Sequence, residues 1–198
     1  MPFRTWPDKL DAPLPRRFTA EDLRLMLAAG ILHEDERVEL LDGELVEMAA
    51  KGFAHDVVKN ALMRRLVRPL PATIDLGIEG TLQLGPGLLL APDLLLAPVS
   101  ARRASPEGFC TIEGPEIPLV IEVAASSLAD DRRRKAAFYA RHGVREYWVV
   151  DAQERGAWMH RSPVEGVCRD VTELSRDATL RPEAASLAGV TVPLPDLG

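Results

Sequence analysis

Two apolar segments, each interrupted by one acidic residue, constrain the fold of this chain more than any other feature. They read GLLLAPDLLLAP over residues 87–98 and EIPLVIEVAA over residues 116–125. Near-continuous apolar runs of this length are typical of strands that are buried on both faces of a sheet. We therefore expect a sheet whose central strands carry Asp93 and Glu122.

Each of these carboxylates also has a simpler explanation. Pro and Asp are common in turns, so Asp93 could lie at the exposed end of a turn between two strands. Glu122 could point to water from an edge strand, although apolar residues flank it at both strand parities. An unpaired carboxylate in the core would cost several kcal/mol, so a buried Asp93 or Glu122 requires a cation, hydrogen-bond donors or a proton.

Two such carboxylates on strands that could be neighbours suggest a shared site. A hard cation such as Mg²⁺ binds one or two protein carboxylates together with waters and phosphate oxygens. A bound Mg²⁺ or Mn²⁺ would polarise a phosphoryl oxygen and lower the pKa of a bound water. The pair therefore predicts a divalent-metal site at Asp93 and Glu122.

The N-terminal part of the chain predicts a helix and a hairpin. Thr19 is suited to cap a helix that ends at Gly30. Asp42-Gly43 stands between two β-prone runs, which is a strong signal for a tight hairpin.

Further along, the apolar spacing predicts helices over residues 55–67 and 130–142, and strands that include residues 144–151. We expect an α/β fold with a mixed β-sheet flanked by helices. A proline-rich arm, residues 1–17, precedes a single domain over residues 18–198.

Composition limits the classes of function. The net charge of −6 argues against a uniformly basic nucleic-acid coat, although a local basic groove stays open. The two cysteines form no disulfide framework or zinc motif, and no apolar run reaches the ~18 residues that span a bilayer. We expect a cytoplasmic protein without a membrane segment.

A lysine on the helix that follows the Glu122 strand could join the two carboxylates. Lys135 could orient an attacking water or stabilise charge in the transition state. Asp131 lies four residues earlier on the same helix face, so spacing alone favours an exposed Asp–Lys pair of little energetic consequence.

The order of these motifs resembles the Uma2 family, which belongs to the PD-(D/E)xK nuclease-like superfamily, also called restriction endonuclease-like. The resemblance extends from Phe18 to Trp158, and the segments that carry it are ELLDGELVEM, APDLLL, LVIEVAASS and GVREYWVVD, with His55 and Lys135 between them.

The resemblance implies a restriction endonuclease-like core and an Mg²⁺-dependent phosphodiesterase site. Asp93 matches the motif Asp and Glu122 the motif acidic residue. The motif lysine position is Ala124 here, and Lys135 on the following helix matches the lysine of Uma2-like members. Glu39 matches a further acidic residue near the site, and for it a solvated strand position stays open.

His55 matches a family histidine at the start of a helix, where a purely structural role is the alternative. Arg132 and Arg133 are candidates for contacts with substrate phosphates, although charge runs on helices are often solvated faces. Glu146 and Asp151 are expected to be structural partners for arginines.

The leading hypothesis is a metal-dependent endonuclease that hydrolyses nucleic acid, with DNA as the expected substrate. A catalytically inactive module that keeps the fold for binding nucleic acid or protein is the alternative, and Ala124 and the acidic net charge favour it. The proline-rich arm leaves open a homodimer or higher homo-oligomer.

Overall fold

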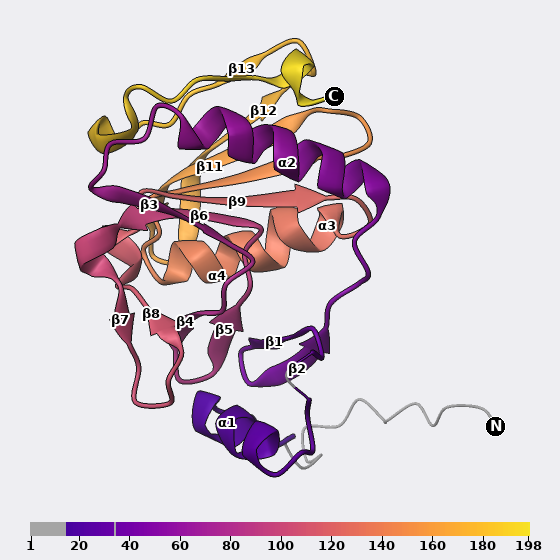
Figure 1. The fold of residues 1–198 in the computed structure, drawn as a ribbon, viewed down its shortest axis with the longest axis vertical. Coiled ribbons are helices and arrows are strands. Elements are labelled where there is room, and N and C mark those ends of the chain that lie inside the picture. The colour runs from indigo at the N-terminus through magenta and orange to yellow at the C-terminus, as the bar shows by residue number, and fades with distance from the viewer. Residues whose placement is uncertain (1–14, 34) are drawn as a thin grey trace, which may run out of the picture.

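The computed structural model describes residues 15–33 and 35–198, and most of the predicted N-terminal arm lies outside these residues. Two six-stranded mixed sheets form the body of the molecule (Figure 1). In what we call the N-terminal sheet, the order is β2-β1-β5-β4-β8-β7. In the central sheet it is β12-β11-β10-β9-β6-β3. A two-stranded ribbon, β13 with β14, lies near the C-terminus.

The strands of the N-terminal sheet are β1 (Val38–Leu41), β2 (Glu44–Glu47), β4 (Leu82–Gly85), β5 (Leu88–Leu90), β7 (Arg103–Ala104) and β8 (Cys110–Thr111). Those of the central sheet are β3 (Ile74–Ile78), β6 (Leu94–Pro98), β9 (Leu119–Ala124), β10 (Glu146–Asp151), β11 (Ala157–Val164) and β12 (Val167–Leu174). The ribbon is β13 (Thr179–Leu180) and β14 (Val192–Pro193).

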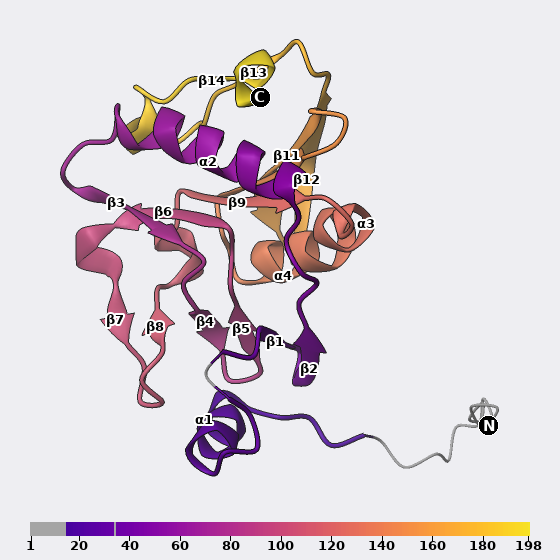
Figure 2. The same ribbon diagram turned by 45° about the vertical axis from the view of Figure 1, so that its right-hand side comes forward.

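Helices cover both sheets. The helix α2 (Phe53–Val67) lies on one face of the central sheet, with the C-terminal segment beside it (Figures 1 and 2). On the other face lies a helical segment made of α3 (Leu128–Asp130), one π-helical turn (Asp131–Lys135) and α4 (Ala136–Arg141). The helix α1 (Ala20–Ala28) packs on the N-terminal sheet, away from the central one. The predicted α/β class, with mixed sheet and flanking helices, is confirmed.

The apolar run over residues 87–98 contributes one strand to each sheet. β5 pairs within the N-terminal sheet, whereas β6 pairs with β9 in the central sheet, with Leu94 opposite Ile121. Ala91-Pro92-Asp93 connects the two strands, and Pro92 has no N–H group to donate to a ladder. The sequence predicted one mixed sheet, but the structure has two, because the chain passes from one sheet to the other at this segment.

The side chains alternate along β9 between two cores. Ile121 and Val123 face α2, while Val120 and Ala124 face α4 and the N-terminal sheet. By this alternation Glu122 points toward the helical segment that carries Lys135. The packing of two apolar layers against one sheet thus fixes the direction of the acidic side chain.

The predicted hairpin is confirmed and closes in the left-handed backbone region. Asp42 has φ of 52° and Gly43 has φ of 78°, as a tight two-residue turn requires. A Cβ atom at Gly43 would come within 2.7 Å of Cβ of Arg17. The turn therefore holds β1, and with it Glu39, against the segment that precedes α1.

None of the helices in the described part of the chain combines the length and the apolar character needed to cross a lipid bilayer.

Gly114 lies between β8 and β9 and packs against the backbone that follows α4, and its substitution tests this contact. A Cβ atom there would lie 1.8 Å from the carbonyl oxygen of His142, whereas one at Gly80 would meet nothing within 4 Å. We expect Gly114→Ala to lower the free energy of unfolding by about 2 kcal/mol or more, because backbone must move. Gly80→Ala should stay within about 0.5 kcal/mol in the same urea titration. Equal effects would contradict this placement.

Candidate active site

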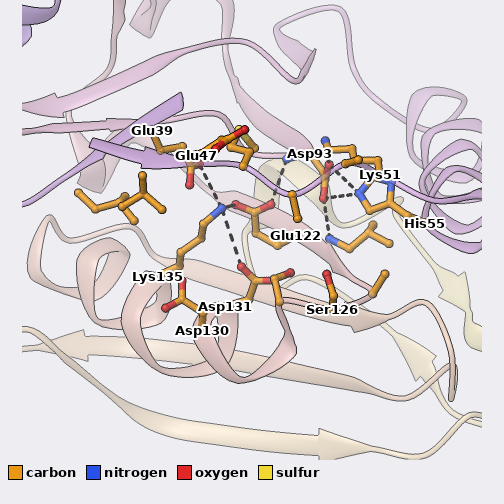
Figure 3. A pocket seen from close by; sticks show the side chains of 18 residues that line it. Glu39, Glu47, Lys51, His55, Asp93, Glu122, Ser126, Asp130, Asp131 and Lys135 are labelled. Carbon is orange, nitrogen blue, oxygen red and sulfur yellow. Dashed lines mark hydrogen bonds and ion pairs between the residues drawn. The ribbon is translucent and has the colours of Figure 1, made fainter. Parts of the chain in front are cut away.

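A pocket of about 250 Å³ lies where the two sheets approach each other. The hairpin strands β1 and β2, the loop after β2 and the first turn of α2 line one part of it (Figure 3). Asp93 before β6, the end of β9 and the start of the helical segment line the rest. The pocket brings together Glu39, His55, Asp93, Glu122 and Lys135, which the sequence had singled out.

Asp93 precedes β6 and is only 3% exposed. It lies between two strands, as the turn interpretation held, but its side chain points inward. Its carboxylate accepts the backbone N–H of Val123 at 2.8 Å and lies 3.0 and 3.1 Å from Nε2 of His55. The ammonium of Lys51 contacts the same carboxylate. Burial alone would raise the pKa of Asp93, but the bonds from His55 and Lys51 hold it well below its usual value.

Glu122 lies inside β9 and is 4% exposed, so the solvated edge-strand interpretation is wrong. One carboxylate oxygen is 3.0 Å from Nζ of Lys135 and accepts the hydroxyl of Tyr139 at 3.4 Å. The other accepts the backbone N–H of Asp93 at 3.4 Å. Burial raises the pKa of Glu122 to about 8; Lys135 opposes this shift, and the nearby charge of Asp93 adds to it.

Lys135 lies at the centre of a buried cluster of acids. Its ammonium is 3.0 Å from Glu122, 3.1 Å from Glu39 and 3.8 Å from Asp131. Burial would lower the pKa of Lys135, but the charges of Glu122, Glu39 and Asp131 raise it above its usual value. The Asp131–Lys135 pair expected at the surface is therefore buried, because the π-helical turn faces both sheets.

Glu39 connects this cluster to the chain segment between the sheets. It is 3% exposed, and its carboxylate accepts the backbone N–H of Ala91 at 2.9 Å. The solvated position considered for this residue is wrong. The same side chain binds Lys135 and the segment that leads to Asp93, so it fixes the two halves of the pocket relative to each other.

The two arginines predicted to contact substrate do not line the pocket. The guanidinium of Arg132 stacks over the ring of Trp158 at 3.9 Å, and Arg133 is exposed on the outside of the helical segment. A contact of either residue with substrate stays a prediction.

Two other acids have structural partners. Glu146 binds Arg161 at 2.7 Å, as predicted. The prediction for Asp151 is wrong, because its carboxylate accepts the backbone N–H groups of Gln153 and Glu154 and so closes the turn after β10.

Sequence reasoning missed a second lysine, Lys51, and its partners. Lys51 lies in the unpatterned loop before α2 and donates to Glu79 at 2.7 Å as well as to Asp93. Lys59 donates to the same oxygen of Glu79 at 2.5 Å. Burial opposes ionisation of Glu79, but the two lysines lower its pKa to about 2. No periodicity marks Lys51, and only its nearness to His55 in the sequence could have drawn attention to it.

The donor set of the pocket suits a hard divalent cation, although among residues 15–33 and 35–198 no three His, Cys, Asp or Glu side chains are arranged as a formed metal site. Four carboxylates are buried around two ammonium groups; they are Glu39, Asp93, Glu122 and Asp131, with Lys51 and Lys135. With every group ionised, two negative charges remain in excess, which one divalent cation would offset. Carboxylate oxygens are also the ligands that Mg²⁺ and Mn²⁺ accept.

The sheets and helices define a mixed α/β fold in which two mixed sheets are flanked by helices. The chain belongs to the Uma2 family, whose model, described as "Putative restriction endonuclease", matches residues 20–195.

Among solved structures, the chain is similar to one described as "a putative nuclease belonging to DUF820" from Anabaena variabilis. The two share 14% identity and a TM-score of 0.68, over 91% of this chain and 97% of that one. At this identity the likeness shows the fold. No curated protein matches the chain significantly.

The raised pKa of Glu122 predicts how stability depends on pH. Between pH 4.5 and about 8 the folded protein keeps a proton that the unfolded chain releases, so stability falls as the pH rises through this interval. This proton on Glu122 lowers the free energy of unfolding by at most about 1.4 kcal/mol per pH unit as the pH rises. Glu122→Gln cannot titrate, so its free energy of unfolding should fall less between pH 5 and pH 8. Urea titrations in EDTA measure both proteins, and parallel pH profiles would contradict the burial of an ionisable Glu122.

Proposed function

We propose that this protein is a metal-dependent endonuclease that hydrolyses phosphodiester bonds of nucleic acid, with DNA as the expected substrate. The observation that carries the proposal is the junction of Asp93 and Glu122. The two lie side by side at adjoining strands, and Lys135 donates to Glu122.

In this proposal Asp93 and Glu122 hold the divalent cation. Asp93 is ionised at neutral pH, and the backbone N–H of Val123 fixes its orientation. Glu39 lies across Lys135 from Glu122 and is the next carboxylate within the pocket. A bound Mg²⁺ or Mn²⁺ would supply an activated water and offset charge on the phosphoryl oxygens.

Lys135 takes the place that the strand lysine occupies in the superfamily motif. The residue two positions after Glu122 is Ala124, which is fully buried and packs in the apolar core. The ammonium of Lys135 reaches the same carboxylate from the helix instead. From there it favours the ionised form of Glu122 against the effect of burial, and it can orient a water or stabilise negative charge on the phosphate.

The pKa of Glu122 implies that cation binding competes with a proton. At pH 6 the carboxyl of the cation-free protein is largely protonated, and ionisation increases toward pH 8. A cation at the pocket favours the ionised form, so the affinity should rise with pH over this interval.

The β2–α2 loop forms the side of the pocket next to Asp93, where Lys51 contacts its carboxylate, and a nucleic-acid strand on this side would pass Lys51 and His55. Lys51 and Lys59 place two ammonium groups at this side, where Asp93 and Glu79 balance their charge. Each ammonium can donate a hydrogen bond to a phosphate oxygen of a nucleic-acid strand.

The direct test is cleavage of supercoiled plasmid and of single-stranded DNA and RNA with Mg²⁺ or Mn²⁺. We expect Asp93→Ala and Lys135→Met to lower the cleavage rate at least about 100-fold, because the first removes a ligand of the cation and the second a positive charge that acts at the phosphate. Asp170→Ala and Arg169→Met, which change the same charges on the exposed strand β12, should cleave as wild type does.

Cleavage that persists undiminished in Asp93→Ala would contradict the proposal. Absence of cleavage with every metal and substrate, together with intact nucleic-acid affinity, would favour the binding module instead. A homodimer or higher homo-oligomer is a separate prediction, and light scattering measures the oligomeric state.

A further inference from the structure

Asp93 has a counter-cation within its own chain. The ammonium of Lys51 contacts Oδ1 of Asp93, and the two side chains are 13% and 4% exposed. Water and salt screen such a pair only weakly. Lys51 reaches Asp93 from the loop between β2 and α2, so it belongs to neither sheet that builds the pocket (Figure 3).

Glu79 offers the same ammonium a second acceptor. Lys51 donates to Oε1 of Glu79 at 2.7 Å, and Lys59 reaches that oxygen from α2 at 2.5 Å. The four side chains therefore form a row of alternating charge, which runs from Lys59 through Glu79 and Lys51 to Asp93.

The backbone holds Glu79 beside Asp93. Glu79 follows β3 with φ of 52°, a left-handed conformation that is uncommon outside glycine. Its N–H donates to the carbonyl oxygens of Pro92 at 3.1 Å and Asp93 at 3.3 Å. A residue kept in this conformation by the segment that carries Asp93 is a fixed acceptor and not a chance surface contact.

We propose that Lys51 is an exchangeable internal cation: it neutralises Asp93 until a divalent ion binds there, and it then keeps only its bond to Glu79. This inference rests on the proposed function, because it takes Asp93 to be a metal ligand. His55 remains on Asp93 in both states, since the imidazole can donate a hydrogen bond without carrying charge.

The exchange has two consequences for the site. Before the ion binds, Lys51 relieves the cost of a buried carboxylate. The ion must also displace the ammonium, so its apparent affinity is the intrinsic affinity multiplied by the fraction of molecules in which Asp93 is free of Lys51. Lys51 would thereby set the ion concentration at which the site becomes loaded.

Calorimetric titration of the full chain with Mn²⁺ tests the competition. If Lys51 occupies Asp93 in about nine-tenths of the molecules, Lys51→Met should lower Kd about tenfold. Lys59→Met is the matched control: it removes the same charge from Glu79 without touching Asp93. A general electrostatic effect would act on both, and we expect less than about threefold for Lys59→Met.

A double-mutant cycle of Glu79 and Lys51 tests the role of Glu79. Glu79→Gln should weaken Mn²⁺ binding in the wild type, because the displaced ammonium loses its acceptor. In the Lys51→Met background the same substitution should have a clearly smaller effect, since no ammonium remains to be held. Equal effects in the two backgrounds would overturn the exchange onto Glu79.

The outcomes separate this inference from the proposed function. Equal changes of Kd in Lys51→Met and Lys59→Met, or weaker binding in Lys51→Met, would overturn the exchange while the metal site stands. If neither wild type nor Lys51→Met takes up Mn²⁺ at millimolar concentration, both fall. Lys51→Gln, which keeps a hydrogen-bond donor without the charge, should also tighten binding and serves if Lys51→Met does not fold.

Discussion

Between β5 and β6 the chain leaves one sheet and enters the other through Ala91-Pro92-Asp93, and this passage places a carboxylate where the two sheets meet. Glu39 binds the N–H of Ala91, Glu79 binds the carbonyl oxygens of Pro92 and Asp93, and Asp93 accepts the N–H of Val123. The N-terminal sheet, the strand β3 and the strand β9 are thereby held to one short segment. The shape of the pocket depends on that attachment.

Stability alone gives little reason to bury a cluster of charges around this segment, so the cluster favours a functional role. Buried ion pairs commonly add little or nothing relative to apolar residues of the same shape, because ions must leave water. Here Lys135 shares its ammonium among several carboxylates, and the pKa of Glu122 rises to about 8. Perturbed ionisation in a cleft is typical of functional sites. A divalent cation would stabilise these carboxylates, which the chain's own lysines neutralise only in part.

The sequence predicted what depends on local pattern and missed what depends on distant contacts. The turn at Asp42-Gly43, the helix α2 and the buried strand around Glu122 follow from residue types and apolar spacing alone. Lys135 required the resemblance to a family, because a lysine four residues after an aspartate ordinarily faces water. Lys51 had no signal except its nearness to His55, since it lies 42 residues from Asp93 in a loop without periodicity. The number of sheets was missed for the same reason: β5 and β6 look like one continuous apolar run.

The central claim is that Asp93 and Glu122 bind one divalent cation, and a crystal grown with Mn²⁺ tests it most directly. Anomalous difference density should mark an ion bound by carboxylate oxygens of both residues, with the ammonium of Lys51 on Glu79 and no longer on Asp93. A crystal at saturating Mn²⁺ without density between the two carboxylates, and with Lys51 still on Asp93, would contradict the account.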